Sequence, residues 1–366
     1  MSDPAPLVLL AAGGTGGHLF PAESLAVALS KHGLTVDLAT DERATRYGMS
    51  FPARATHIIP SATVRGRDPI SLARTAALLS LGTMKAWSLL GRLRPAAVVG
   101  FGGYPTVPPL LAAAWRSIPT VLHEQNGIMG RANRFLAPRV TAIATGFREI
   151  RGASPALTAK MSFTGNPVRP QVIAAAVAPY ATADAGALRL VVFGGSQGAM
   201  IMSRVVPAAI ERLDAALRSR LHIVQQARAE DLDRVRATYA RLEVAAETAA
   251  FFPDLPARIA AAHLIVSRSG ASTVAELAAI GRPAILVPLP HALDQDQLAN
   301  AGILEQAGGA IRIDQAAFTP ERLAAEIAAL YGDPSRLATM AAKAKSAGTI
   351  DAADRLADLV IKTAGT

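Results

Sequence analysis

Residues 7–17 read LVLLAAGGTGG, and residues 188–198 read LRLVVFGGSQG. Each stretch is a short apolar run, typical of a strand buried on both faces, followed by a glycine-rich turn and then a helical pattern. A glycine turn between a strand and a helix lets backbone N–H groups approach a phosphate at the helix N-terminus. The two stretches therefore predict two α/β domains that open in the same way.

Short apolar runs alternate with amphipathic helical patterns along the rest of the chain. This order predicts βαβ units with parallel sheets. We therefore expect an α/β protein with two Rossmann-like, doubly wound domains that face each other across a cleft. Beyond the two opening strands, we predict strands at 35–39, 57–60, 97–100, 120–123, 141–144, 222–226, 264–267, 284–288 and 310–313, and helices at 21–32, 203–217, 274–280 and 320–331.

We place the domain boundary near Gly165-Asn166-Pro167, where a proline and a polar turn interrupt the pattern. The predicted domains are residues 1–165 and residues 166–350. Residues 351–366 are expected to form a last helix that could pack on either domain, including back on the N-terminal one.

The composition fits a folded, reduced protein. Hydrophobic residues make up 51% of the 366 residues and charged residues 18%, so a large core can be buried. Cysteine is absent, which excludes disulfides, thiolate metal sites and a cysteine nucleophile. The uncharged stretches 4–22 and 95–115 contain glycines and prolines that argue against membrane spans, and no basic signal-peptide start precedes Asp3. We expect a soluble cytoplasmic protein.

The net positive charge comes entirely from the first half of the chain. Residues 1–166 hold 17 Lys and Arg against 8 Asp and Glu, whereas residues 167–366 hold 20 of each. Such an excess attracts nucleic acid, a phosphorylated ligand or acidic lipid headgroups. Aromatic residues are only 5% and no stacking platform is visible, which argues against nucleic acid.

The glycine turns fit neither common nucleotide motif. A P-loop ends in Gly-Lys-Ser/Thr, whereas these turns end in Gly17-His18 and Gly198-Ala199. The dinucleotide fingerprint fails because Leu19 stands where its last glycine is needed. ATP hydrolysis and NAD binding therefore lose support.

A second candidate phosphate site lies at Ser267–Glu276, where a buried strand runs into a helix. Ser269, Ser272 and Thr273 offer hydroxyls and N–H groups to a diphosphate, and Glu276 could accept two hydrogen bonds from ribose hydroxyls. The alternative is a capping box, since Thr273-x-x-Glu276 has that spacing.

Six segments taken together carry a family resemblance. They are Gly13–His18 with Phe20-Pro21, Gly102-Gly103-Tyr104, His123–Gly127, Gly165–Arg169, Gly194–Ala199 and Ser267–Glu276. Through them the chain resembles, nearly end to end, the MurG family of bacterial glycosyltransferases, which belongs to family 28 and has the GT-B fold.

The resemblance implies a metal-independent, inverting transfer of N-acetylglucosamine (GlcNAc) from UDP-GlcNAc. The acceptor would be the C4 hydroxyl of N-acetylmuramic acid (MurNAc) in undecaprenyl-pyrophosphoryl-MurNAc-pentapeptide, which converts lipid I to lipid II in peptidoglycan synthesis. UDP-GlcNAc would bind the C-terminal domain and the lipid acceptor the N-terminal one. The enzyme would lie peripherally on the cytoplasmic face of the cell membrane, where wall-synthesis or division proteins are possible partners.

The resemblance also implies roles for individual residues. Phe252 would bind uracil through its backbone with Phe251 beside it, Glu276 would hold the ribose, and Arg169 would reach the nucleotide. Ordinary core packing is the alternative for the two phenylalanines, and a surface ion pair for Arg169. The diphosphate would lie at Ser196 and the turn of Ala271, Ser272 and Thr273; the donor sugar would meet Thr15, Gly16, Gly17, Asn126 and Gln297; Gly14, Gly103 and Tyr104 would form the acceptor and diphosphate loop.

The sequence departs from the family pattern at one position. Asp296-Gln297 stands where many relatives carry two glutamines. We assign the sugar-contacting amide to Gln297, and the role of Asp296 stays open.

The reaction needs one general base, because inversion in a single displacement removes one proton from the acceptor hydroxyl. His18, at the mouth of the first glycine turn, is the first candidate and Glu124 the second; a structural histidine is the alternative. The strings Asp231-Leu-Asp233 and Asp294-Gln-Asp296 are expected to open helices rather than bind a required metal. A UDP-sugar epimerase on the same scaffold is the rival enzyme.

A membrane face is predicted between residues 65 and 94. Apolar residues here are rimmed by bases, and Asp68 is the only acid. Such a segment is typical of a protein that lies on anionic lipid without spanning it. The alternative is a core-facing helix with a solvated basic side. The predicted face comprises Arg65, Arg67, Arg74, Leu78, Leu79, Lys85 and Trp87.

Overall fold

The computed structural model of the chain describes residues 5–13, 16–42, 51–62, 68–183, 186–195, 198–290 and 295–365. The chain divides into two compact units. Unit 1 comprises Met1–Arg169 together with Ile350–Thr366, and unit 2 comprises Pro170–Thr349. The division falls a few residues beyond the predicted boundary, and the chain passes from one unit to the other twice.

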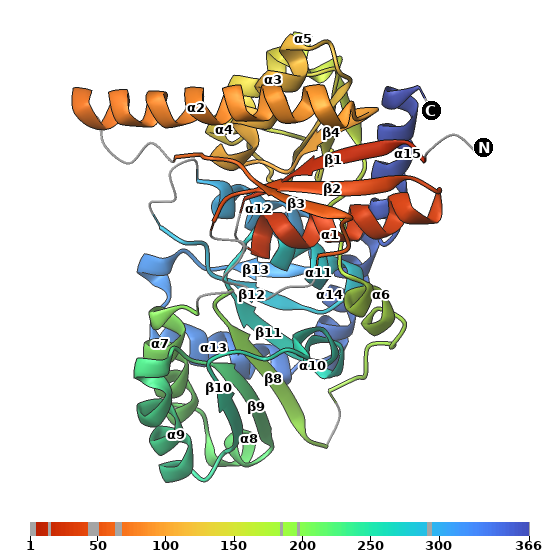
Figure 1. Ribbon diagram of the computed structural model, residues 1–366. Helices are drawn as coiled ribbons and strands as arrows, with labels where there is room; N and C mark the ends of the chain where they lie inside the picture. The colour runs from red at the N-terminus through yellow and green to blue at the C-terminus, as the bar shows by residue number, and fades with distance from the viewer. Residues whose placement is uncertain are drawn as a thin grey trace. The chain divides into compact units, whose positions relative to one another are not determined.

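Unit 1 is built on a parallel sheet with the strand order β3-β2-β1-β4-β5-β6-β7 (Figure 1). The chain winds outward in one direction from β1 to β3 and in the other from β4 to β7, so β1 and β4 flank the point where the winding reverses. The strands are β1 (Leu7–Ala11), β2 (Thr35–Thr40), β3 (Ala55–Ile58), β4 (Ala97–Gly100), β5 (Thr120–Glu124), β6 (Ala142–Thr145) and β7 (Met161–Phe163). The first six match predicted ranges to within two residues, and β7 was not predicted.

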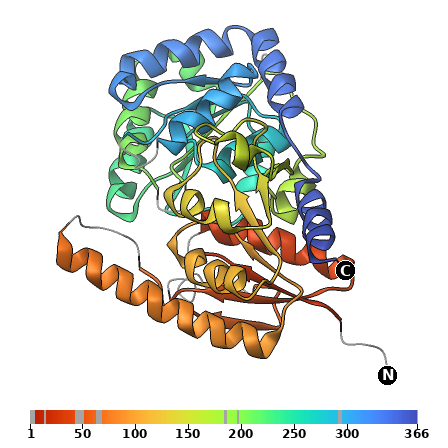
Figure 2. The ribbon, with the colours of Figure 1, turned by 90° about the horizontal axis from the view of Figure 1, so that it is seen from above.

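Two helical layers cover this sheet. Leu25 of α1 and Leu356 and Val360 of α15 share one core with Val8, so the last helix belongs to unit 1 and lies beside α1 (Figure 2). The opposite core contains Leu90 of α2 and residues of α3 and α4. The helices of unit 1 are α1 (Gly16–Lys31), α2 (Pro69–Leu93), α3 (Val107–Trp115), α4 (Arg131–Leu136), α5 (Pro155–Thr158) and α15 (Ala352–Ala364), with 3-10 turns η2 (Tyr104–Thr106) and η3 (Ala137–Arg139).

Helix α1 begins five residues earlier than predicted. Proline is common at the first position of a helix, which favoured a start at Pro21. The helix begins instead at Gly16, directly after the glycine turn, and contains Pro21. His18 consequently lies in the first turn of α1 rather than in a loop.

Helix α2 is long and only partly covered. Its start is capped by Asp68, whose carboxylate accepts a hydrogen bond from the Ser71 N–H at 2.8 Å. Its buried residues lie mostly in the second half, where Gly82 passes so close to Pro60 that a Cβ would collide with the Pro60 carbonyl oxygen. The first half projects beyond the strands (Figure 1). No helix among the described residues has the length and apolar character needed to cross a membrane.

Unit 2 repeats the plan with the parallel order β10-β9-β8-β11-β12-β13, so its winding reverses between β8 and β11. The strands are β8 (Leu188–Phe193), β9 (Leu221–Gln226), β10 (Ala245–Ala249), β11 (Leu264–Ser267), β12 (Ala284–Leu286) and β13 (Ala310–Arg312). All but β10 were predicted. These two sheets confirm the predicted α/β class with doubly wound parallel sheets.

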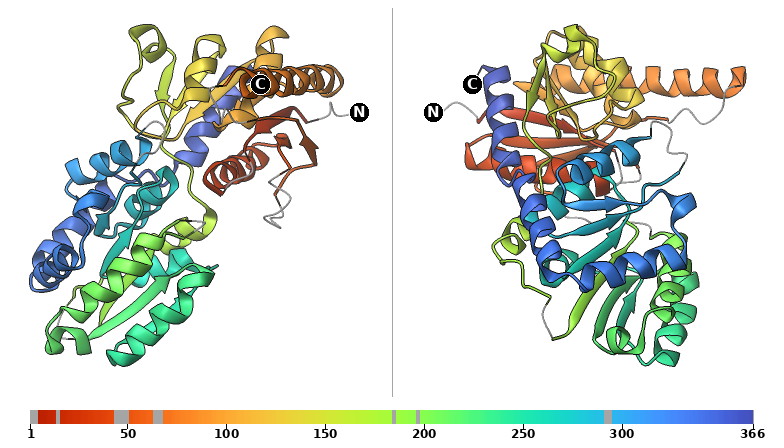
Figure 3. Two further views of the ribbon diagram at one scale, coloured as in Figure 1. Left: turned by 90° about the vertical axis from the view of Figure 1, so that its left-hand side faces the viewer. Right: turned by 180° about the vertical axis from the view of Figure 1, so that it is seen from behind.

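Helices cover both faces of the second sheet. Residues of α7, α9, α13 and α14 contribute to one large core. Helices α13 and α14, in blue, face the viewer in the right-hand view of Figure 3. The predicted helix 203–217 is interrupted, because Asp214 caps a new helix through the Leu217 N–H at 2.6 Å. The helices are α6 (Pro170–Ala175), α7 (Met200–Glu211), α8 (Ala215–Ser219), α9 (Leu232–Arg241), α10 (Leu255–Ala261), α11 (Ala271–Ile280), α12 (Asp296–Gln306), α13 (Pro320–Tyr331) and α14 (Pro334–Ser346), with 3-10 turns η4 (Ala229–Asp231) and η5 (Gln315–Ala317).

Candidate active site

In doubly wound sheets, ligands bind outside the carboxyl ends of the strands where the winding reverses. In unit 1 this place lies after β1 and β4, and in unit 2 after β8 and β11. The predicted glycine turns follow β1 and β8, Gly102-Gly103 follows β4, and Ser267–Glu276 includes the end of β11. The fold therefore brings the predicted segments to one candidate region in each unit.

The His18 side chain lies against the glycines that follow β4. A Cβ placed on Gly102 would lie 3.6 Å from Nε2 of His18, and one on Gly103 would lie 3.5 Å from Cε1. Both glycines have positive φ angles, 86° and 74°, which side chains rarely adopt. On its other side, Nδ1 of His18 would lie 3.7 Å from a Cβ on Gly13. The ring is thus held between the two turns that flank the reversal point.

The remaining residues of the predicted acceptor loop continue this turn. Tyr104 begins the 3-10 turn η2, and the Thr106 hydroxyl donates a hydrogen bond to the Gly103 carbonyl oxygen at 2.8 Å. Gly16 and Gly17 are the first residues of α1. Gly14 and Thr15 lie outside the described residues.

The Glu124 carboxylate organises the loop that follows β5. Its side chain is buried, with the residue 1% exposed. Oε1 accepts hydrogen bonds from the Asn126 backbone N–H at 3.0 Å and from the Asn126 amide at 3.3 Å. Oε2 accepts from the Gly130 N–H at 2.9 Å and from the Asn133 amide at 2.8 Å. Burial raises the pKa of Glu124, and these hydrogen bonds act in the opposite direction. With both oxygens engaged, the geometry favours a positioning role over that of a base.

His123, next to Glu124, is also buried. Burial lowers the pKa of its imidazole to about 4, so the ring is neutral near pH 7. Nε2 lies 3.2 Å from the Gly165 carbonyl oxygen, which can only accept, so Nε2 carries the proton. Its ring also lies against Phe101, with the centroids 5.6 Å apart.

Arg169, where the first segment of unit 1 ends, packs against α1. Its guanidinium carbon is 4.3 Å from the centroid of the Phe20 ring, and Phe20 in turn covers Gly16. Burial raises the pKa of Glu23 on the same helix, while the charge of Arg169 lowers it. Arg169 is therefore placed beside the predicted sugar-binding turn.

In unit 2, the turn after β11 is the N-terminus of a helix. Gly270 is the N-cap of α11, and Ala271, Ser272 and Thr273 form its first turn. Thr273 is thus the third helical residue and not the cap, so the capping-box alternative is wrong. Glu276 follows within the same helix and is largely buried. The first N–H groups of α11 point toward the carboxyl edge of the sheet, the arrangement that binds a phosphate.

Helix α12 is tied to this turn. The Ser269 hydroxyl donates to the Gln297 carbonyl oxygen at 2.8 Å, and the Asn300 amide donates to the Ser269 carbonyl oxygen at 3.2 Å. The Gln297 side-chain oxygen accepts from the Leu289 N–H at 3.0 Å, and the Asp296 carboxylate accepts from the Gln297 N–H at 2.8 Å. Ser269 therefore supports the turn through its hydroxyl. In the Gln297 side chain, the oxygen is the atom that binds Leu289, and the amide nitrogen takes no part in that bond.

The two phenylalanines after β10 differ in exposure. Phe252 is 7% exposed, whereas Phe251 is 63% exposed, so core packing describes the ring of Phe252 only. Gln226 links this segment to the second glycine turn, because its amide donates to the Ala250 carbonyl oxygen at 3.1 Å and accepts from the Gly194 N–H at 3.0 Å. Ser196 lies outside the described residues.

Of the two acidic strings, only Asp231-Leu-Asp233 lies wholly within the described residues. Asp231 precedes α9 and accepts a hydrogen bond from Arg234 at 2.6 Å, while Asp233 lies in the first turn of that helix. Asp231 and Asp233 therefore open a helix, as predicted. Asp294 lies outside the described residues, and Asp296 begins α12.

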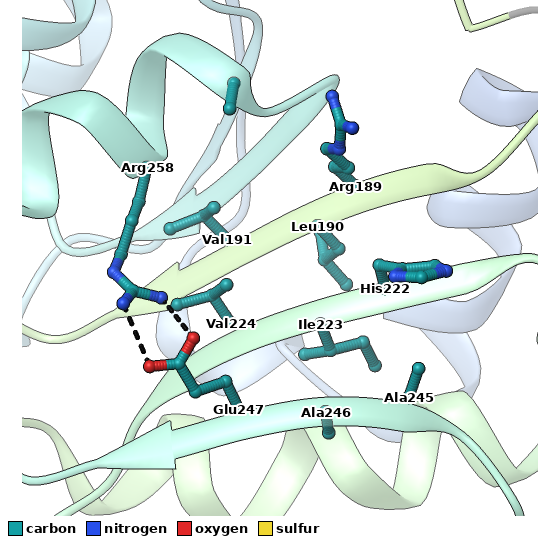
Figure 4. A pocket seen from close by; sticks show the side chains of 11 residues that line it. Arg189, Leu190, Val191, His222, Ile223, Val224, Ala245, Ala246, Glu247 and Arg258 are labelled. Carbon is teal, nitrogen blue, oxygen red and sulfur yellow. Dashed lines mark hydrogen bonds and ion pairs between the residues drawn. The ribbon is translucent and has the colours of Figure 1, made fainter.

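A cavity of about 400 Å³ lies away from these edges (Figure 4). It is lined by the first halves of β8, β9 and β10, including Val191 and Val224, and by Arg258 of α10. The guanidinium of Arg258 forms two hydrogen bonds to the Glu247 carboxylate, at 2.5 and 2.9 Å. None of the predicted binding residues lines this cavity, so it does not belong to the candidate active site.

Comparisons with known proteins agree with this arrangement of the two sheets. The model of the glycosyltransferase family 28 N-terminal domain matches residues 8–145, and that of the C-terminal domain of the same family matches residues 189–356. A Rhodopseudomonas palustris protein is 62% identical over 365 residues and is covered completely, as is this chain. The chain belongs to glycosyltransferase family 28. The predicted family and enzyme class are thereby confirmed.

Two relatives of this family 28 glycosyltransferase share one name. The Rhodopseudomonas protein and a Bradyrhizobium protein, 60% identical with both chains fully covered, are each named UDP-N-acetylglucosamine–N-acetylmuramyl-(pentapeptide) pyrophosphoryl-undecaprenol N-acetylglucosamine transferase. Among solved structures, Acinetobacter baumannii MurG has a TM-score of 0.79 at 28% identity, with 98% of this chain and 99% of that chain covered. These relatives place the family 28 chain in the MurG family.

A more distant likeness concerns the fold alone. UDP-GlcNAc 2-epimerase from Neisseria meningitidis has a TM-score of 0.66 at 13% identity, with 98% of this chain and 99% of that chain covered. The family 28 scaffold is thus shared with epimerases. The full-length identity to the transferases, and not the fold, separates the two possibilities.

Sequence reasoning missed Asn133 among the residues that build the candidate site. Asn133 lies in α4, is buried, and donates to Glu124. No local motif marks it, since its role depends on the packing of α4 beside the end of β5.

Proposed function

We propose that this chain transfers GlcNAc from UDP-GlcNAc, with inversion, to the C4 hydroxyl of MurNAc in undecaprenyl-pyrophosphoryl-MurNAc-pentapeptide. The observation that carries the proposal is the 62% identity, over the full length of both chains, to a relative named for this transfer. The product would be lipid II, the lipid-linked disaccharide used in peptidoglycan synthesis.

The chemistry is a single displacement. The C4 oxygen of the acceptor forms a bond to the anomeric carbon of GlcNAc, and the bond from that carbon to the β-phosphate oxygen of UDP breaks. The hydroxyl proton passes to neutral His18, the general base of the proposal. His18 lies against the turn of Gly102 and Gly103, so its ring is fixed before the acceptor binds.

The leaving group is stabilised in unit 2. The departing UDP gains negative charge, and the N-terminus of α11 presents backbone N–H groups and the positive end of a helix dipole. Ala271, Ser272 and Thr273 would contact the diphosphate with Ser196, Glu276 the ribose, and the backbone of Phe252 the uracil. We propose that this electrostatic stabilisation by the N-terminus of α11 takes the place of a metal, so that no divalent ion is required.

We further propose that α2 rests on the anionic surface of the cytoplasmic membrane leaflet. Its bases Arg74, Lys85, Arg92 and Arg94 are exposed. Its exposed apolar residues include Leu81, Met84 and Trp87, with Met84 63% exposed. Leu78 and Leu79 are half-buried, so the predicted apolar stripe serves partly as packing. The guanidinium of Arg116 lies 4.1 Å from the centroid of the Trp87 ring and holds the ring at this surface. Arg65 and Arg67 lie outside the described residues.

The test follows UDP release by the purified full chain with UDP-GlcNAc in EDTA, with and without the lipid-linked acceptor. We expect release only with acceptor, together with a new disaccharide-lipid. Activity that requires added magnesium would retain the transferase and refute metal independence. Conversion of UDP-GlcNAc without acceptor would favour the epimerase. Folded protein that releases no UDP in the presence of acceptor, either in EDTA or with added magnesium, would refute the transferase.

A further inference from the structure

The first passage of the chain out of unit 1 is fixed by buried hydrogen bonds. Residues Gly165–Arg169 lead from β7 to the start of unit 2 at Pro170. The Gly165 carbonyl oxygen accepts from Nε2 of His123 at 3.2 Å, and the Asn166 amide donates to the Gln125 carbonyl oxygen at 2.8 Å. The linker is therefore bound to the end of β5 and to the residue that follows it.

Asn166 has little freedom to leave this position. It is buried, and a Cβ on Gly146 would collide with its amide group. Its side-chain oxygen is buried and has no hydrogen-bond partner among the described residues. Such a group opposes stability, so packing alone does not account for an asparagine at this position.

The same segment supports the turn beneath His18. The Gln125 amide donates to the Phe101 carbonyl oxygen at 2.9 Å, directly before Gly102. The Asn133 amide, which binds Glu124, would lie 3.4 Å from a Cβ on Gly102. The backbone of Phe101–Gly103 is thus hydrogen-bonded by Gln125 and packed against Asn133.

We propose that Asn166 and Gln125 are positioning residues that couple the linker between the units to the turn of Gly102 and Gly103, against which the His18 ring packs. A change in the direction of the chain at Gly165–Arg169 shifts the Gln125 backbone through the Asn166 amide. The Gln125 side chain then passes this shift to the Phe101 carbonyl and so to the glycines against His18. Because each bond is buried, breaking it leaves a polar group without water, and the three segments move together. The inference rests on the proposed role of His18 as the base.

The test is a double-mutant cycle with Asn166→Ala and Gln125→Met, the second of which keeps the side-chain length and removes the donor. We expect each single variant to lower kcat on the order of tenfold, with KM for UDP-GlcNAc changed less than threefold, because the base is displaced while the donor site is kept. The double variant should be little worse than either single one, since both interrupt one chain of contacts. Full multiplication of the two effects, or wild-type kcat in the single variants, would overturn the coupling.

The matched control is Thr120→Val, at the opposite end of β5. Thr120 is buried and its hydroxyl accepts from the Thr141 N–H at 3.0 Å, so the variant loses a comparable hydrogen bond outside the coupled segments. We expect a lower Tm with unchanged kcat. A fall in kcat equal to that of Asn166→Ala would show that any loss of stability in β5 produces the effect.

A second readout is independent of activity. The ¹³Cε1 NMR signal of His18, assigned by its loss in His18→Gln, should shift in Asn166→Ala and in Gln125→Met but not in Thr120→Val. If wild-type protein shows no acceptor-dependent UDP release but the signal shifts, the coupling holds and the proposed function fails. If wild-type protein is active and the signal stays in place in both variants, the coupling fails and the function holds.

Discussion

The guanidinium carbon of Arg258 lies 4.5 Å from the centroid of the Phe252 ring. Arg258 is held in this place by three charge-assisted hydrogen bonds, two to Glu247 and one of 2.8 Å to Asp254. These partners raise the pKa of Arg258, so it is charged at any relevant pH. The cation packs on a ring that is almost fully buried, directly beneath the segment proposed to bind uracil.

Arg258→Met is therefore expected to weaken UDP-GlcNAc binding without slowing the chemical step. A cation–π contact contributes about 1 kcal/mol, so KM should rise about fivefold while kcat stays within twofold. Titration calorimetry with UDP and initial rates measure the two effects separately. Arg236→Met is the control. Arg236 is exposed and contacts Thr248, which lies on β10 beside the Arg258 partner Glu247, and its side chain does not stack on Phe252. Equal effects of the two variants would contradict a specific role for Arg258.

His18→Gln should strongly reduce turnover while leaving the fold intact. General base catalysis contributes about 10²–10⁴-fold, and we expect kcat to fall within that range. Thermal unfolding should show a Tm within a few degrees of wild type, because the ring packs on the glycines of two turns and not in either core. Near-normal kcat in a folded His18→Gln protein would return the histidine to a structural role.

Glu124→Gln separates the two candidates for the base. Four N–H donors converge on the carboxylate, and the glutamine NH₂ group would face two of them. We expect a loss of about 3 kcal/mol in the free energy of unfolding, measured by urea titration, together with a loss of activity. Exposed Glu149→Gln is the control. Lost activity with full stability would instead support Glu124 as the base.

Asp37 on β2 should make unit 1 sensitive to acid. Burial raises the pKa of Asp37, but hydrogen bonds from Arg54, at 2.9 and 3.0 Å, and from His57, at 2.8 Å, hold it below its usual value. A lowered folded-state pKa stabilises the protein above the ordinary aspartate pKa of about 3.9, and this contribution is lost as the pH falls through the lower value.

Asp37→Asn is expected to be less stable than wild type by about 2 kcal/mol at pH 7 and to approach it below about pH 3. Tm measured between pH 2.5 and 7 checks this. Asp354→Asn, which removes an exposed carboxylate 3.7 Å from Lys31, should leave the pH dependence unchanged. Parallel Tm curves for Asp37→Asn and wild type would refute the role of the carboxylate.

Met84→Glu should weaken binding to vesicles of phosphatidylcholine and phosphatidylglycerol in a 3:1 ratio. The change removes an exposed apolar side chain from α2 and adds a charge of the same sign as the lipid, so the partition coefficient should fall about tenfold. Sedimentation with the vesicles measures it. Val177→Glu is the control, because Val177 is 81% exposed in unit 2. Equal losses for the two variants would refute a membrane surface on α2.

The strands were predictable where their residues are buried on both faces. Leu7–Ala11 and Leu188–Phe193 are continuous apolar runs, and both form strands with the expected bounds. Ala245–Ala249 was missed because AAETA has neither an apolar run nor alternation, and as an edge strand β10 is largely exposed. A strand that buries little leaves little pattern in the sequence.

The sequence predicted which segments form the candidate site but not which of their residues contact one another. His18 and Gly103 both follow strands at the reversal point, but their meeting depends on the pairing of β1 with β4. The role of Asn133 has the same origin, since its partner Glu124 lies on β5 and no spacing rule joins the two. Thr273 shows the reverse error: a capping pattern was visible, but the helix begins at Ala271 with Gly270 as its N-cap.

Helix α15 affects the order in which the chain can fold during synthesis. Leu356, Ala357 and Val360 complete a core whose other members, Val8 and Leu25 among them, leave the ribosome first. All of Pro170–Thr349 is translated before these residues appear, and that unit has a core of its own. The later half can therefore finish folding while the earlier half still exposes apolar surface. In a nascent chain, the apolar surface around Val8 and Leu25 thus stays exposed until α15 has been synthesised.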